Sequence, residues 1–122
     1  MNLAVIGSGG REHAICYKLK QSPKIKKLIC IPGNAGIEEI AENINVDISN
    51  FDLIYEILKK YKIDIVVIGP EKPLVDGLTN FLNEKKIRVF GPDKFCSQLE
   101  GSKAFMKDLC KKNNIPTADY GI

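Results

Sequence analysis

The amino-terminal stretch constrains the fold more than any other part of the sequence. Residues 3–6 form a short, uninterrupted apolar run, which is typical of a strand buried on both faces of a parallel sheet. The run leads into the glycine-rich residues 7–10 and then into apolar residues at helical spacing. A strand that passes through a tight glycine turn into a helix is the first part of a βαβ unit.

The rest of the chain repeats this alternation. Further strands are predicted at residues 28–31, near 44–46, and at 64–68 and 88–90. Helices are predicted between them, with apolar faces that include residues 51–58 and 74–82, and two more follow in the last third of the chain. Because right-handed crossovers join parallel strands, we expect an α/β fold with a doubly wound, mostly parallel sheet and helices on both faces.

A chain of 122 residues is long enough for one domain with its own core and for the beginning of another. No apolar run approaches the ~20 residues that cross a bilayer, and no secretory signal precedes the glycine turn. The expected compartment is therefore the cytoplasm, with no membrane partner.

Charge and cysteine content argue against two classes of site. The net charge of +3 is mild, and the lysines cluster where helices should end, where they complement the helix dipole. No aromatic residues are interleaved with them to stack on bases, so no nucleic-acid partner is expected. The four cysteines contain no close C-x-x-C pair, so neither a metal site nor a redox site is predicted.

Four glycine-containing turns follow the predicted strands, at residues 7–10, 32–36, 69–71 and 91–93. In a doubly wound sheet, ligands bind beyond the carboxyl ends of the strands, and all four turns lie at that edge. The sequence therefore predicts a binding site formed by these turns.

The first of these turns is suited to an anion. Gly9 and Gly10 allow the backbone N–H groups to approach a ligand, and the helix that follows directs its positive end to the same point. Arg11 adds a guanidinium group that fits phosphate or carboxylate oxygens. Alternatively, the glycines only turn the chain and Arg11 lies in solvent. His13 either donates to the anion or serves as a packing or capping residue.

A dinucleotide site is the main competing interpretation of the turn, and two residues argue against it. Glu12 stands where the third glycine of the dinucleotide fingerprint packs helix against strand, a place where a carboxylate is awkward. Pro32 follows the second strand in place of the acid that would bind a ribose hydroxyl. We interpret Glu12 as a first-turn acid and expect a single phosphate rather than a nicotinamide or flavin cofactor.

Glu71 follows the buried strand at residues 64–68, after Gly69 and Pro70. Its carboxylate could accept from the hydroxyl or amine groups of a ligand. On the spacing alone, a solvated acid before Lys72 is an equal alternative.

Six motifs follow one another in a specific order. They are VIGSGGREH at residues 5–13, PGNAG at 32–36, VIGPEKPLVDG at 67–77, FGP at 90–92, QLEGSKAFMK at 98–107 and IPTA at 115–118. Together they resemble the amino-terminal part of the phosphoribosylamine–glycine ligase family, also called glycinamide ribonucleotide synthetases. The resemblance covers the whole chain and implies an ATP-grasp ligase with a Rossmann-like pre-ATP-grasp domain at its amino terminus.

The resemblance implies the second step of de novo purine synthesis. ATP phosphorylates the carboxylate of glycine, and the amine of 5-phosphoribosylamine attacks the acyl phosphate to give glycinamide ribonucleotide, ADP and phosphate. Residues 1–100 would then help to hold the phosphoribosyl substrate. Gly9, Gly10 and Arg11 are candidates for its phosphate end, and Asn34 and Glu71 for its ribose or amine end.

The resemblance also assigns residues 101–122 to the first helix of the ATP-grasp domain, where Lys103 would contact the nucleotide phosphates. The implied cofactors are ATP with Mg²⁺ or Mn²⁺, bound mainly outside the 122 residues, so no catalytic or metal-binding residue is predicted within them. We therefore expect no ligase activity from these residues alone. A stand-alone sugar-phosphate- or nucleotide-binding module with a regulatory or scaffold role is the alternative.

Overall fold

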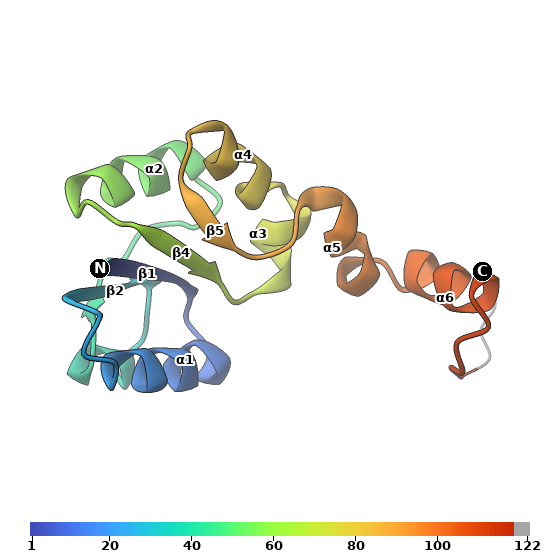
Figure 1. Ribbon diagram of the computed structural model, residues 1–122, viewed down its shortest axis with the longest axis horizontal. Coiled ribbons are helices and arrows are strands. Elements are labelled where there is room, and N and C mark those ends of the chain that lie inside the picture. The colour runs from blue at the N-terminus through green and yellow to red at the C-terminus, as the bar shows by residue number, and fades with distance from the viewer. Residues whose placement is uncertain (119–122) are drawn as a thin grey trace.

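A parallel sheet forms the centre of the computed structural model, which describes residues 1–118 (Figure 1). Its five strands lie in the order β3-β2-β1-β4-β5, and every neighbouring pair is parallel. The strands are β1 (Asn2–Gly7), β2 (Lys27–Pro32), β3 (Glu42–Asn43), β4 (Ile65–Ile68) and β5 (Arg88–Phe90). The predicted α/β fold with a parallel sheet is confirmed.

Helices cover both faces of the sheet, as predicted. The helix α1 (Gly10–Lys20) and the short 3₁₀ helix η1 (Ile37–Glu39) pack on one face, with Cys16 and Ile37 fully buried against it. The opposite face is covered by α2 (Phe51–Lys60), α3 (Glu71–Val75) and α4 (Leu78–Glu84). Figure 1 shows the sheet between these two layers.

The central strand β1 explains why the sheet has a core on each face. Ala4 and Ile6 point into the core shared with α2, α3 and α4, whereas Leu3 and Val5 point to the side of α1. Successive side chains of a strand alternate between faces, so only a strand that is apolar at every position can contribute to two cores. The apolar run predicted from the sequence is this strand.

Two elements differ from their predicted form. The third strand is β3 rather than a strand at residues 44–46, although Ile44 still donates its N–H to the carbonyl of Cys30. Ile44 and Val46 pack against the core beyond the end of the strand, and this packing accounts for their apolar pattern. The helix predicted across residues 74–82 is divided into α3 and α4, because Gly77 adopts a φ of +96°.

The last helices lead away from the sheet. The helix α5 (Lys94–Gly101) is followed at once by α6 (Lys103–Lys112), and α6 extends beyond the rest of the molecule (Figure 1). The rings of Phe95 and Phe105 meet edge to face, with centroids 5.9 Å apart. Residues 119–122 of the predicted second segment lie outside the described residues. Within residues 1–118, no helix has both the length and the apolar character needed to span a membrane.

Candidate functional site

The turn between β1 and α1 lies at the point where the sheet reverses its direction of growth. The strand β2 is added on one side of β1, and the chain then returns to place β4 on the other side. Ligands of doubly wound proteins bind at such a switch point, outside the carboxyl ends of the strands. The turn at residues 7–10 is therefore in the expected position for a ligand site.

An open pocket of about 410 Å³ occupies this position. It is lined by the turn itself, by the start of α1 and by two residues from elsewhere in the chain, in full Gly7, Ser8, Gly9, Gly10, Arg11, Glu12, Ile48 and Pro70. The structure thus brings together three of the predicted binding residues, Gly9, Gly10 and Arg11. Their contact with a ligand stays a prediction.

Arg11 connects two turns. Its Nη1 donates a hydrogen bond to the carbonyl oxygen of Gly69, in the turn between β4 and α3. Arg11 is exposed, as in the alternative that places it in solvent, but this bond ties its guanidinium group to a second turn. Because a guanidinium group carries five N–H donors, this bond uses only part of its capacity.

Glu12 is buried, with 4% of its surface exposed. Its Oε2 accepts a hydrogen bond of 2.8 Å from the N–H of Gly9, which is the residue that caps α1. Glu12 is a first-turn acid, as interpreted from the sequence, but it also fills the space beside Gly7 and Gly69. The position where a carboxylate was expected to be awkward accommodates it because both neighbours lack a side chain.

Asn34 holds the second predicted turn against the first. Its Nδ2 donates to the carbonyl of Ser8 at 2.8 Å, and its Oδ1 accepts from the N–H of Ile37 at 2.9 Å. The carbonyl of Asn34 accepts from Nδ2 of Asn43 at 2.7 Å. Asn34 therefore has a structural role at the site, and its contact with a ligand stays a prediction.

His13 is half-buried on α1 and faces the same turn as Asn34. A methyl group built on Gly36 would lie 2.7 Å from Cε1 of His13, so the imidazole packs closely against this glycine. This contact favours the packing alternative for His13 over a contact with an anion.

The remaining predicted residues lie outside the pocket lining. Glu71 is exposed and begins α3 directly after Pro70, which places it at the rim of the pocket. Lys103 is exposed at the start of α6, which packs on α5 and not on the glycine turn. The fourth predicted turn also lies apart from the pocket, because Gly91 packs against Leu74 and Thr79 instead.

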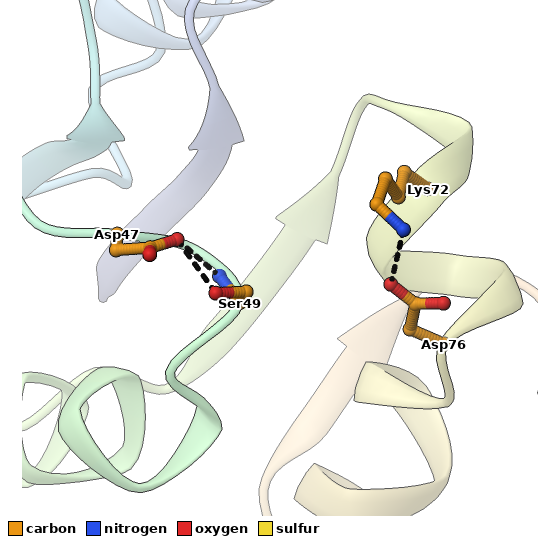
Figure 2. Close-up of polar contacts among 4 residues, drawn as sticks. All are labelled: Asp47, Ser49, Lys72 and Asp76. Carbon is orange, nitrogen blue, oxygen red and sulfur yellow. Dashed lines mark hydrogen bonds and ion pairs between the residues drawn. The ribbon is translucent and has the colours of Figure 1, made fainter.

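Ile48 is a pocket residue that the sequence analysis missed. Asp47 and Ser49 hold the loop around it, because Oδ1 of Asp47 accepts from the N–H and the hydroxyl of Ser49 at 2.9 and 2.8 Å (Figure 2). These bonds lower the pKa of the Asp47 carboxyl. An isoleucine in a loop carries no sequence signal for a binding role, so only the structure identifies it.

The helix α3, which begins at Glu71, carries an ion pair. Nζ of Lys72 lies 3.1 Å from Oδ2 of Asp76, the residue that follows the last residue of α3 (Figure 2). Both side chains are exposed, so the pair contributes little to stability.

The described part of the chain offers no metal centre. Within residues 1–118, no group of three or more His, Cys, Asp or Glu side chains could hold a metal ion.

The comparisons with known proteins all indicate the same family. Residues 1–100 match the family described as "Phosphoribosylglycinamide synthetase, N domain". The chain is 50% identical over 121 residues to the phosphoribosylamine–glycine ligase of Mesorhizobium japonicum, and 44% identical over 122 residues to that of Clostridium acetobutylicum. These matches cover 99% and 100% of this chain but only 28% and 29% of the relatives, so the chain spans less than a third of their length.

Solved structures agree with this assignment. The phosphoribosylamine–glycine ligase of Thermotoga maritima matches 98% of the chain with a TM-score of 0.69 and 32% identity, over 26% of its own length. The N5-carboxyaminoimidazole ribonucleotide synthetase of the same organism matches 97% of the chain with a TM-score of 0.72, over 32% of its own length. At 19% identity, the second match is evidence for the fold alone.

Proposed function

The chain belongs to the phosphoribosylglycinamide synthetase N-domain family, and we propose from this that it forms the amino-terminal domain of a phosphoribosylamine–glycine ligase and helps to hold the phosphoribosyl substrate. The observation that carries the proposal is the coincidence of two findings. The family match covers residues 1–100, and the pocket at the switch point of the sheet lies within them.

The proposed reaction divides between this domain and the rest of the ligase. Glycine is activated when its carboxylate oxygen attacks the γ-phosphorus of ATP, which releases ADP and leaves glycyl phosphate. The amine of 5-phosphoribosylamine then attacks the carbonyl carbon, phosphate leaves, and the nitrogen loses a proton. ATP with Mg²⁺ or Mn²⁺ supplies the phosphoryl group, and we assign their binding to the part of the ligase outside the pocket described above. Lys103 is our candidate for a contact with the nucleotide.

Within this domain, we assign the residues of the pocket to binding and orientation. An α-helix leaves the N–H groups of its first turn without partners in the helix, and in α1 those of Gly10 and Arg11 border the pocket. Together with the guanidinium of Arg11, they suit the phosphate of the substrate. Glu71 at the rim suits a ribose hydroxyl or the amine, with Asn34 holding the neighbouring turn in place.

A regulatory or scaffold module that binds a sugar phosphate is the less favoured alternative. The whole chain is similar to ligases, including the segment after residue 100, which a stand-alone binding module would not need. No contact within residues 1–118 favours the alternative specifically.

Replacement of Arg11 by alanine in the full-length ligase tests the proposal. The variant should lose about 1.5–3 kcal/mol of substrate binding, because hydrogen bonds to charged groups have this strength. The KM for 5-phosphoribosylamine should therefore rise about tenfold or more, whereas those for ATP and glycine should not change. Arg88→Ala is the matched control, since Arg88 is the other arginine of the chain and lies exposed on β5. Equal KM values for both variants would contradict the assignment of the phosphate to this turn.

A further inference from the structure

The pocket contains a buried carboxylate to which the proposed function gives no role. Glu12 is 4% exposed and lines the pocket from the first turn of α1. Removing a carboxylate from water is costly unless hydrogen bonds and favourable charges compensate it. The contacts of Glu12 therefore indicate why a carboxylate occupies this place.

The first contact removes a donor from the ligand site. Oε2 of Glu12 accepts the N–H of Gly9 at 2.8 Å. In a turn that binds a dinucleotide, the backbone at the second glycine approaches the pyrophosphate closely. Here the same N–H is bonded to a side chain of its own helix, so Gly9 can border a ligand but does not donate to it.

The second contact is steric and joins two turns. A methyl group built on Gly7 would lie 2.4 Å from Cγ of Glu12, and one built on Gly69 would lie 2.0 Å from its Oε1. Gly7 is the last residue of β1, where the glycine turn begins, and Gly69 follows directly after β4. The side chain of Glu12 therefore fills the space between Gly7 and Gly69.

Arg11 spans the same gap from the adjacent position. Its Nη1 donates to the carbonyl of Gly69, while Glu12 packs against the α-carbon side of this glycine. Arg11 and Glu12, which are adjacent in the sequence, thus both contact Gly69.

We infer that Glu12 is a positioning residue for the phosphoribosyl substrate. It withdraws the Gly9 N–H from the ligand and holds the two turns at a fixed separation, which directs the Gly10 N–H and the Arg11 guanidinium toward the substrate. The inference rests on the proposed function for the identity of the substrate. The positioning itself depends only on the contacts of Glu12.

The positioning is tested without any assay of activity. Hydrogen exchange at the Gly9 amide should be slow in the unmodified full-length protein and should accelerate at least about tenfold in Glu12→Ala, because the acceptor is lost. Glu12→Gln has the same length and still offers an oxygen, so it should restore slow exchange. Asp52→Ala is the matched control, because Asp52 is an exposed first-turn acid of α2. If Glu12→Ala does not fold, Glu12→Asp replaces it, since its carboxylate ends one methylene short of Gly9.

Kinetics of the ligase then separate positioning from a general loss of stability. Glu12→Ala should raise the KM for 5-phosphoribosylamine about tenfold, leave the KM values for ATP and glycine unchanged, and recover in Glu12→Gln. Exchange at Gly9 that is unaffected by Glu12→Ala would overturn the inference, as would faster exchange with an unchanged KM for 5-phosphoribosylamine. A wild-type protein without ligase activity would instead contradict the proposed function, and the exchange result would still decide on the positioning.

Discussion

The side chain of Glu12 is accommodated because its two neighbours, Gly7 and Gly69, have no side chains. The turn, its place at the start of a helix and the first-turn position of Glu12 were predictable from the sequence. The burial of Glu12 was not predictable, because the space for its side chain depends on Gly69, which is distant in sequence. The hydrogen bond from Arg11 to Gly69 was unpredictable for the same reason.

The tight packing around Gly69 predicts a specific loss of stability. Gly69→Ala should lower the free energy of unfolding by about 1–3 kcal/mol, because the new methyl group would overlap the carboxylate of Glu12. The measurement is chemical denaturation followed by circular dichroism. Gly10→Ala is the control, since a methyl group built there has no atom within 4 Å apart from its chain neighbours and the backbone of its own helix. It should leave stability unchanged or raise it slightly.

If the overlap with Glu12 is the cause, the double variant Glu12→Ala/Gly69→Ala should be less destabilised than the sum of the two single variants. Additive effects would contradict the contact, because residues that touch are expected to be coupled energetically.

At the scale of the elements, apolar periodicity predicted a helix or strand correctly where its apolar pattern does not continue into the next element. The helix α2 and the strand β4 lie close to where the sequence predicts them. The division between α3 and α4 was missed, because the apolar residues on both sides of Gly77 continue at helical spacing. The positive φ of Gly77 is a backbone property that the spacing of side chains does not reveal.

The start of α5 predicts a pH dependence. Oδ1 of Asp93 accepts a hydrogen bond of 2.7 Å from the N–H of Cys96. Hydrogen bonding to Cys96 is the main cause that lowers the pKa of Asp93 from its usual 3.8. A lowered pKa in the folded state means that the charged form stabilises the fold. This contribution is complete well above pH 3.8 and is lost as the pH falls through the lowered folded-state pKa.

Melting temperatures of Asp93→Asn and Asp93→Ala measure this contribution. Asp93→Asn keeps an acceptor for the helix cap but no charge, so it should melt below the wild type at pH 7, and the difference should vanish in acid. Asp93→Ala should remain less stable at every pH, because even protonated Asp93 accepts a hydrogen bond. A constant difference between wild type and Asp93→Asn would contradict the role of the charge.

At the scale of the whole molecule, one sheet joins two cores. Ile37 is fully buried on the side of α1, and Leu58 is 1% exposed on the side of α2. Because both cores share the strands β1, β2 and β4, we expect them to unfold in a single transition. The lysines at the ends of helices, such as Lys59 and Lys60 in the last turn of α2, lie where the sequence analysis placed them.

Replacements in the two cores test whether both unfold in a single transition. Ile37→Ala and Leu58→Ala should each lower the free energy of unfolding by about 2–5 kcal/mol. Each should also preserve one cooperative transition, seen at the same denaturant concentration by fluorescence and by circular dichroism. Leu53→Ala is the matched control on α2, because Leu53 is 39% exposed and its removal should cost less than about 0.5 kcal/mol. Two separate transitions would show that the cores are independent.

The central claim is that the turn after β1 binds the phosphoribosyl group of a ligase substrate. Calorimetric titration of the full-length ligase with ribose 5-phosphate, and separately with NADH, tests it most directly. We predict that ribose 5-phosphate binds, that Arg11→Ala weakens this binding about tenfold or more, and that NADH produces no binding heat. Binding of NADH without a response to ribose 5-phosphate would contradict the claim.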